Sequence, residues 1–441
     1  MNKIKVLVKE KSIVNVIWLS ADSFFRLGLG FIVSVWLARY LGPNDFGMYN
    51  YAFAMITIYS AVASLGMNGV VVRELITGDV DTGVILGTSF FLQCIGSVIA
   101  SVMVVMTTML LRPDEWDLIL VIATMIPSVL LRSSDILKYW FESIISAKYT
   151  VIAQNIAFFI SAILKIIIIL YNGSYLLISF TVSCEVLITA FLLYALYKRK
   201  KYKIAWKIEL SEARRLLSLS WPLIISGVAL MLYMRIDQLM IGNMIDNAAV
   251  GVYSVAVKMV EIWYFLPVAI VSSFFPKIIK SKKISEENYN NQLQFLYDVL
   301  VVFSVTLALV VTFLSDYIIH FFYSEQYFAA SKLIKLYAWV SVFYFLSSAS
   351  GRWYINEGLQ KYALNRNLLG LGLGILLNYL LIPRFGAEGS VYATLIAYSC
   401  AGYFFDILSK NTRIVFFQKS KSLWFPGAVL RLKNKFMGRD A

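Results

Sequence analysis

Long apolar runs of about twenty residues recur along almost the whole chain, and they limit its possible folds more than any other feature of the sequence. Residues 83–111, for example, contain no charged side chain. A helix of about twenty residues crosses the hydrocarbon core of a bilayer, which is about 30 Å thick. The strands of a membrane barrel would instead give shorter segments in which apolar and polar residues alternate. We therefore predict an all-α polytopic membrane protein.

Turn residues and charged residues separate the apolar runs, and these breaks predict twelve transmembrane helices. The predicted spans are residues 14–41, 46–66, 83–111, 117–142, 148–171, 174–197, 216–243, 248–275, 293–322, 328–355, 363–382 and 387–409. The basic segment Met1–Ser12 could mimic a signal peptide, but the run that follows is long and carries Asp22 and Arg26. We interpret it as an uncleaved first span.

The composition excludes several classes of protein. Hydrophobic residues make up 59% of the 441 residues and charged residues only 15%, so twelve spans leave little chain for a water-soluble catalytic domain. The single histidine, His320, and three cysteines inside apolar runs argue against metal sites, His-based triads and a disulfide framework. A phosphate-binding loop of the G-x-x-x-x-G-K-[ST] type is also missing. We expect no enzyme, no cofactor and no metal site.

The formal net charge of +14 would suggest nucleic-acid binding in a soluble protein, but here it indicates basic cytoplasmic loops. Lysine and arginine are concentrated in the N-terminal stretch, in the loops after the sixth and eighth spans, and in the tail, at residues 3–11, 198–215, 277–283 and 410–439. The connections on the opposite side contain no lysine and only one arginine, Arg384; they are residues 42–45, 171–174, 243–247 and 383–387. Both termini are therefore predicted to be cytoplasmic, and no nucleic-acid partner is expected.

The two halves of the chain contain related segments. At an offset of 204 residues, Phe46–Ile58 aligns with Val250–Ile262 with five identities in thirteen positions. Six spans separate the copies, which predicts two six-helix lobes related as parallel repeats, with a central cavity between them. The predicted organisation is an N-terminal lobe, a basic cytoplasmic linker, a C-terminal lobe and a basic cytoplasmic tail, at residues 1–197, 198–215, 216–409 and 410–441. The alternative is a chance match between two amphipathic helices.

Five motifs, in order along the chain, resemble a known family. They are ARYLGPNDFGMYNYA (Ala38–Ala52), LGMNGVVVREL (Leu65–Leu75), RIDQLMIG (Arg235–Gly242), VGVYSVAVKMVEIWYFLPVAIVSSFFPKI (Val250–Ile278) and LIPRFGAEGSVYATLIAY (Leu381–Tyr398). Together they are similar to the Wzx-type O-antigen flippases of polysaccharide and lipopolysaccharide biosynthesis, in the multidrug/oligosaccharidyl-lipid/polysaccharide exporter superfamily. The resemblance implies a bacterial inner-membrane protein that moves an undecaprenyl-pyrophosphate-linked oligosaccharide from the cytoplasmic to the periplasmic leaflet, and that has the polysaccharide assembly machinery as a possible partner. Lipid II flippases of the same superfamily usually carry fourteen spans, so the twelve predicted here argue against that branch.

Charged side chains inside the spans are candidates for a binding site, because a charge at the centre of a membrane helix costs about 2.5 to 3.5 kcal/mol and is retained only beside a cavity or a partner. The cationic candidates for contacts to the diphosphate are Arg26, Lys165, Arg235, Lys258, Arg132 and Arg352. Asp22/Arg26, Arg132/Asp135 and Lys258/Glu261 have the spacing of pairs within one helix, so neutralisation within the fold is an equally good interpretation for them. Lys165 and Arg235 lack a partner at such spacing and are the stronger candidates.

Two acidic residues, Asp237 and Glu185, have no cation three or four positions away and are candidates for coupling transport to a proton or sodium gradient. Their alternative role is structural, through pairing across helices, for instance of Glu185 with Lys165. Two other functions are compatible with a polytopic chain. An ion-coupled drug/cation antiporter of the same superfamily would favour an acidic cavity, and a membrane O-antigen polymerase or glycosyltransferase would need a larger extramembrane loop.

Overall fold

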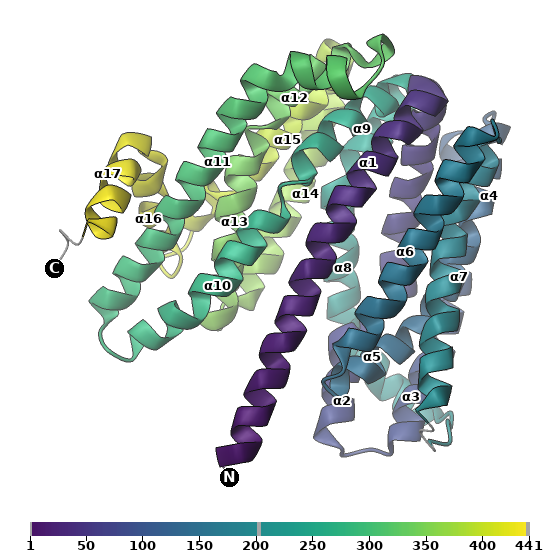
Figure 1. Ribbon diagram of the computed structural model, residues 1–441, viewed down its shortest axis with the longest axis horizontal. Coiled ribbons are helices and arrows are strands. Elements are labelled where there is room, and N and C mark those ends of the chain that lie inside the picture. Colours follow the sequence, from purple (N-terminus) through teal and green to yellow (C-terminus); the bar gives the residue numbers. More distant parts are fainter. Residues whose placement is uncertain (1, 201–203, 438–441) are drawn as a thin grey trace. The chain divides into compact units, whose positions relative to one another are not determined.

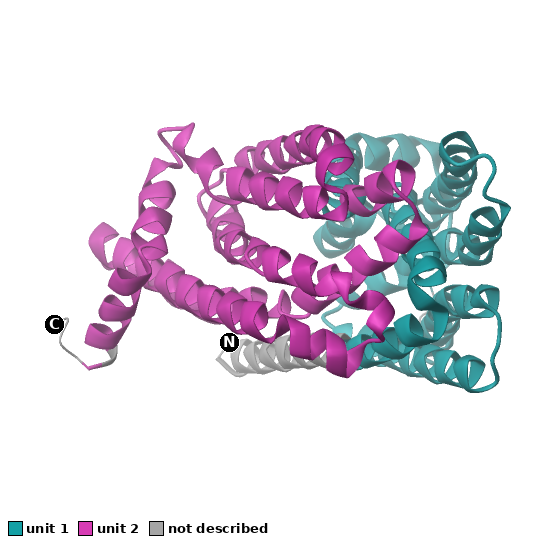
Figure 2. Ribbon diagram, turned by 90° about the horizontal axis from the view of Figure 1, so that it is seen from above, with its two compact units in different colours: residues 1–235 teal, residues 236–441 magenta. Residues whose placement is uncertain are grey.

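The computed structural model describes residues 2–200 and 204–437, without the side chains of residues 2–25, 27 and 436. Within this part every regular element is helical (Figure 1). The chain divides into two compact units, residues 1–235 and residues 236–441 (Figure 2). The boundary falls inside a helix that starts in the predicted linker and continues into the seventh predicted span.

The described residues of the first unit form seven complete α-helices and most of an eighth. They are α1 (Asn2–Ala63), α2 (Met67–Thr77), α3 (Thr82–Leu111), α4 (Trp116–Leu130), α5 (Asp135–Ser143), α6 (Ala147–Leu170), α7 (Tyr175–Arg199) and α8 (Leu210–Met244). The second unit contains the end of α8 and the remaining helices. These are α9 (Asn247–Glu261), α10 (Phe265–Lys282), α11 (Glu286–Phe322), α12 (Ala329–Tyr337), α13 (Val340–Asn356), α14 (Gln360–Phe385), α15 (Ala387–Gly402), α16 (Arg413–Leu423) and α17 (Phe425–Phe436).

The helices correspond to the predicted spans. In the described residues, ten helical segments are long and apolar enough to cross a membrane. One of them combines the first two predicted spans, because α1 continues through a sharp kink at Gly42, where φ is 70°, followed by Pro43. The twelfth predicted span is α15, which has 16 residues. The chain is thus a multi-pass membrane protein, and the predicted all-α polytopic fold is confirmed.

Some predicted spans are broken, contrary to their expected continuity. The fourth consists of α4 and α5, joined by a short 3-10 turn at Leu131–Ser134. Pro127 removes one backbone donor near the end of α4, and the Ser134 hydroxyl donates to the carbonyl of Leu131 at 2.7 Å. The eighth and tenth spans are likewise two consecutive helices each, α9 with α10 and α12 with α13.

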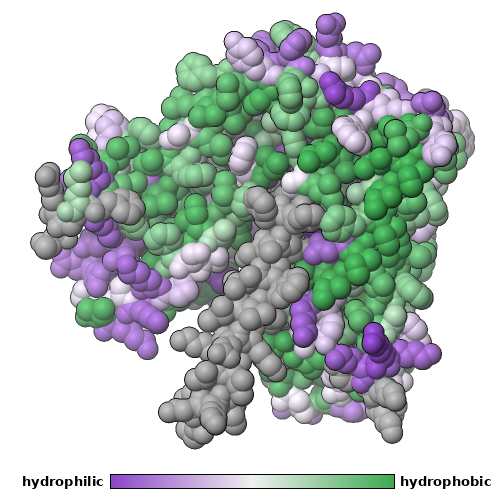
Figure 3. All heavy atoms as spheres, viewed as in Figure 1, coloured by the Kyte–Doolittle hydropathy of each residue, from purple (hydrophilic) through white to green (hydrophobic). Residues whose placement is uncertain are grey.

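The outer faces of the helices are apolar. Large side chains such as Leu170, Phe191 and Phe313 are 66–75% exposed, which in water would be unfavourable but suits contact with lipid tails. On the face drawn in Figure 3, apolar side chains cover the middle of the long helices, and hydrophilic side chains gather near the helix ends. This distribution is the one expected of helices that cross a bilayer.

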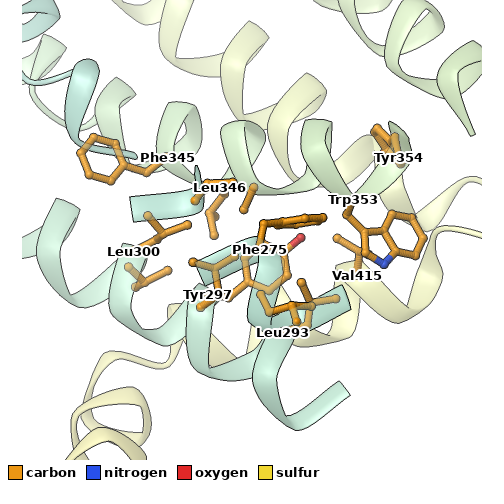
Figure 4. Close-up of a cluster of buried hydrophobic side chains, with 14 of the residues drawn as sticks. Phe275, Leu293, Tyr297, Leu300, Phe345, Leu346, Trp353, Tyr354 and Val415 are labelled. Carbon is orange, nitrogen blue, oxygen red and sulfur yellow. The ribbon is translucent and has the colours of Figure 1, made fainter. Parts of the chain in front are cut away.

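The core of the second unit includes the C-terminal tail. One buried side-chain cluster joins α10, α11, α13 and α16, and Figure 4 shows Val415 of α16 beside Trp353 and Leu293. Val415 is completely buried. The basic tail predicted after residue 409 is therefore folded as two helices, and the first of them belongs to the core.

The predicted linker is fixed against α3 where the structure describes it. The amide of Lys207 donates to the carbonyl of Gly83 at 3.0 Å, and the amide of Glu209 donates to the Thr88 hydroxyl at 3.1 Å. A β-carbon on Gly83 would lie 2.0 Å from the carbonyl oxygen of Ala205, and one on Gly87 would lie 2.3 Å from that of Lys207. Two glycines one helical turn apart thus allow the linker backbone to lie directly on α3.

The repeat found in the sequence coincides with equivalent breaks in the two units. Position 246, which lies 204 residues after the kink at Gly42, is the N-cap of α9. The aligned residues Tyr49 and Tyr253 are both buried, as are the aligned alanines and methionines. The identities therefore lie mainly at packing positions, which explains why they persist where other positions differ.

Candidate functional site

Charged side chains that lie between apolar helices are the main candidates for a functional site in each unit. In the first unit, an ion pair joins Arg26 of α1 to Glu185 of α7, with the guanidinium 3.2 Å from the carboxylate. The two side chains are 30% and 23% exposed. The guanidinium also lies over the ring of Phe158 of α6, 5.2 Å from its centroid. Ser174 caps the start of α7 and so helps to fix the helix that carries Glu185.

Lys165 lies on the same face of α6 as Phe158, two helical turns further along. Its side chain is half-buried, and it forms no ion pair with any side chain that the structure describes. Glu185 therefore pairs across helices, as one interpretation of the sequence expected, but its partner is Arg26 rather than Lys165. The side chain of Asp22, the partner expected for Arg26 within its own helix, lies outside the described residues.

The other cationic candidates are distributed over several helices. Arg132 forms the predicted pair with Asp135, at 3.4 Å, in the turn between α4 and α5. Arg352 is exposed near the end of α13. Arg235, in α8, is the last residue of the first unit, Lys258 lies in α9 of the second unit, and both are half-buried. Within the first unit, the structure thus brings Arg26 together with Glu185 and Arg132 together with Asp135.

In the second unit, Asp237 is the centre of a buried hydrogen-bonded group. Its carboxylate accepts from the hydroxyl of Tyr253 in α9, and this hydroxyl lies 3.5 Å from that of Thr394 in α15. Asp237 is 6% exposed and Tyr253 is completely buried. Asp246 caps the start of α9 by accepting from the amide of Ala249 at 2.7 Å, which fixes the helix that carries Tyr253. Helical spacing along α8 gives no indication of this group, because its members come from three helices.

A second group of charges, which the sequence analysis did not identify, ties the end of the linker to α2. The buried Glu74 accepts from Arg215 at 2.5 Å and from Arg73 at 2.8 Å. Arg215 also pairs with Glu212, 2.7 Å away on the same turn of α8. The sequence signal was the i,i+3 spacing of Glu212 and Arg215, but the contact of Arg215 with Glu74 joins residues that are 141 positions apart.

A third group, also unidentified from the sequence, is buried in the second unit. Lys419 of α16 and Asp406 are completely buried and pair at 2.6 Å. The ammonium also donates to the carbonyl of Gly402 at 2.6 Å and to the hydroxyl of Ser350 at 2.9 Å, so all three of its donors are used. Asp406 accepts in addition from Tyr354. Burial lowers the pKa of Lys419 to about 8, although the neighbouring Asp406 carboxylate opposes this effect.

Arg366 of α14 completes the third group. Its guanidinium donates to the Ser350 hydroxyl at 2.9 Å and lies over the ring of Tyr354, 5.4 Å from the centroid. Among the described residues, no three histidine, cysteine, aspartate or glutamate side chains are grouped so that they could hold a metal ion. The polar groups of both units are thus suited to hydrogen bonding and to neutralising charge inside the membrane.

Comparisons with known proteins agree with this arrangement. The family described as polysaccharide biosynthesis protein matches residues 12–282, and the MatE family matches residues 222–380. The probable low-salt glycan biosynthesis flippase Agl15 of Haloferax volcanii is 21% identical over 394 residues, which cover 86% of this chain and 79% of the relative.

Two kinds of solved structure share the fold. The lipid II flippase MurJ in an inward closed conformation has a TM-score of 0.73 at 17% identity, with 95% of this chain and 93% of that chain covered. An inward-facing multidrug resistance MATE transporter of the MOP superfamily has a TM-score of 0.64 at 11% identity, with 93% and 99% covered. At such identities the similarity shows the fold alone, whereas the family match covers more than half of the sequence. The chain belongs to the polysaccharide biosynthesis protein family.

Proposed function

We propose that the protein is a flippase that moves an undecaprenyl-pyrophosphate-linked oligosaccharide, an O-antigen unit, from the cytoplasmic to the periplasmic leaflet of the bacterial inner membrane. The family supports a role in polysaccharide biosynthesis, and the relative from Haloferax volcanii is itself named as a glycan biosynthesis flippase. In this proposal both termini are cytoplasmic, and the polysaccharide assembly machinery supplies or receives the glycan. No catalytic step is required.

The observation that carries the proposal is the positive charge kept inside the helices of the first unit. Glu185 neutralises Arg26, whereas Lys165 has no acidic partner among the described side chains. An uncompensated cation is costly in a membrane unless an anion or water reaches it. The diphosphate of a lipid-linked sugar is such an anion, and charge-assisted hydrogen bonds from arginine and lysine can replace the hydration that it loses while crossing.

We further propose alternating access, in which two lobes, residues 1–197 and 216–409, rock around a central cavity. Arg26, Lys165, Arg235 and Lys258 would contact the diphosphate, with Arg132 and Arg352 nearer the helix ends. The polyprenyl tail can stay in the lipid, so the cavity needs to admit only the diphosphate and the sugars. In this scheme, the membrane-embedded cations determine the substrate class.

Mutation of Arg235 tests the proposed anion site. Arg235→Ala should abolish surface polysaccharide in the producing cell while the protein remains in the membrane, and Arg235→Lys should restore export only in part, because lysine lacks the bidentate fork. Arg384→Ala is the matched control, since Arg384 lies exposed at the end of α14. Normal export with alanine at both Arg235 and Lys258 would contradict the proposal.

Asp237 and Glu185 remain candidates for coupling to a proton or sodium gradient. Asp237 is buried beside hydroxyl groups of Tyr253 and Thr394, an environment in which a proton or a small cation could be exchanged for a hydrogen bond. Glu185 has Arg26 as its partner, which favours a structural role for that residue. We therefore expect Asp237→Asn to remove the dependence of transport on an imposed gradient more completely than Glu185→Gln. Intact gradient dependence in both variants would exclude both as coupling residues.

Ion-coupled antiport of a drug or cation is the second candidate function. The shared fold with a multidrug transporter and the buried carboxylate of Asp237 favour it. A cation substrate would be repelled by Lys165, which has no acidic partner among the described side chains, whereas a diphosphate would be attracted. Drug resistance that depends on the protein, with unchanged surface polysaccharide, would support antiport over flipping.

A further inference from the structure

The C-terminal helices α16 and α17 expose an apolar and basic face. Ile414, Phe417 and Lys421 are exposed at positions i, i+3 and i+7 of α16, and Leu430, Lys433 and Met437 repeat this spacing along and just beyond α17. Trp424, 68% exposed, stands between the two helices. The opposite face is buried, as Val415 shows. We refer to residues 413–437 as the C-terminal hairpin.

Buried polar contacts fix the orientation of the hairpin. Lys419 is held by Asp406 and two further acceptors on the second unit. Asp298 of α11 receives two hydrogen bonds from Arg431, at 2.7 and 2.8 Å, and one from Ser422 at 2.6 Å. Each hairpin helix therefore has a charged anchor in the body of the unit. The exposed face is presented in a defined direction rather than on a loose tail.

The hairpin helices are too short to cross a bilayer. They contain 11 and 12 residues, about 17 Å each, against a hydrocarbon core of about 30 Å. They pack on α11 between Asn290 and Asp298, where the polar start of this helix gives way to the apolar run beginning at Val299. This transition is the level at which a transmembrane helix leaves the hydrocarbon core.

The charge of the segment indicates what covers the exposed face. Residues 407–439 contain no aspartate or glutamate. Lys421 and Lys433 of the hairpin are exposed at the helical spacing of its apolar side chains, and Lys410, three residues before the hairpin, is exposed as well. Apolar residues flanked by lysine and a tryptophan suit the boundary between lipid tails and headgroups, where the lysine stems follow the apolar surface and the ammonium groups reach the phosphates.

We propose that the C-terminal hairpin is an interfacial membrane anchor that takes the headgroups of acidic phospholipids on its exposed face. Its apolar side chains enter the outer part of the hydrocarbon layer, and its lysines pair with the lipid phosphates. The inference concerns a surface separate from the proposed diphosphate site, so it stands whether or not the protein is a flippase.

A spin label tests this anchor in the full-length protein. Cys94, Cys184 and Cys400 are replaced by serine, and the label is attached to Leu430→Cys. In vesicles containing phosphatidylglycerol, the label should be accessible to oxygen and protected from a water-soluble nickel chelate, and this protection should decrease in pure phosphatidylcholine. A label at Glu287→Cys, exposed in the polar start of α11, should be accessible to the chelate in both kinds of vesicle.

Substitution of the lysines separates binding of acidic headgroups from purely apolar insertion into the bilayer. Lys410→Gln, Lys421→Gln and Lys433→Gln together should remove the difference between the two kinds of vesicle, while Lys277→Gln, Lys280→Gln and Lys283→Gln, three exposed lysines at the end of α10, should leave it unchanged. A label at position 430 that is accessible to the chelate in both vesicles would overturn the proposal. Equal protection in both, or spin–spin broadening from a second copy, would also overturn it.

Discussion

At the residue scale, Lys419 shows how costly a buried charge is even when every donor is satisfied. Its ammonium has three acceptors, including Asp406 at 2.6 Å, yet burial still lowers its pKa to about 8 from an ordinary value near 10.5. Desolvation of an ion in a protein interior costs several kcal/mol, so a buried pair can be less stable than apolar side chains of similar size. The pair therefore serves mainly to fix the position of α16.

The lowered pKa predicts a pH dependence. Between about pH 8 and 10.5, Lys419 is protonated in the unfolded chain but has released its proton in the folded protein. The contribution of Lys419 to the free energy of unfolding therefore rises with pH across that window. Below pH 8 the cost of the buried charge is fully present. Lys419→Met should remove this rise, as measured by the difference in apparent melting temperature between the variant and the unchanged protein at pH 7.5, 9 and 10. A difference independent of pH would contradict the account.

The partners of single residues were the least predictable part of the site. The pair Arg132–Asp135 was predictable because its spacing lies within one helical turn. The contacts of Arg26 with Glu185 and of Lys419 with Asp406 depend on how separate helices pack, which residue spacing does not encode. Glu74 escaped identification for the same reason, since it lies outside the predicted spans and its partner Arg215 is 141 positions away. Arg366 lies inside the predicted span 363–382, so the sequence did offer a signal for it, as a charge within an apolar run.

At the element scale, the long helices were predictable from the apolar runs, and their internal breaks were not. Hydrophobicity continues across the turn at Leu131–Ser134 and between α9 and α10, so the sequence pattern predicted continuous spans there. The C-terminal hairpin was missed because its high charge resembles that of an exposed tail. Its burial depends on one face of α16, which includes Val415 and Lys419.

The contact of the linker with α3 predicts a specific effect of a single methyl group. Gly87→Ala would bring a β-carbon within 2.3 Å of the Lys207 carbonyl, so the linker backbone must move, at a cost of about 1 to 3 kcal/mol. The apparent melting temperature should therefore fall. Gly69→Ala is the control, because a β-carbon on Gly69 in α2 meets no atom within 4 Å. Equal stability of Gly87→Ala and the unchanged protein would contradict the observed contact.

At the scale of the whole molecule, the distribution of lysine and arginine predicts the orientation in the membrane. Reporter fusions that are active only in the periplasm should be silent after Ser211 and after Lys283, and active near Asn172 and Asn247. The structure of each unit is compatible with this map. In the first unit, Asn172 and the 198–215 loop lie at opposite ends of α7, and in the second unit, Asn247 and Lys283 lie at opposite ends of the span formed by α9 and α10. A periplasmic signal from the 198–215 loop would overturn the predicted orientation.

Transport of a lipid-linked diphosphate is the central claim, and reconstitution tests it most directly. Vesicles containing the purified protein and a fluorescent undecaprenyl-pyrophosphate-linked oligosaccharide on one leaflet would be assayed for its appearance on the other leaflet. We expect translocation with the unchanged protein and with Arg384→Ala, and its loss when Arg235 and Lys258 are both replaced by alanine. Translocation no faster than in protein-free vesicles, or undiminished in the double variant, would contradict the account.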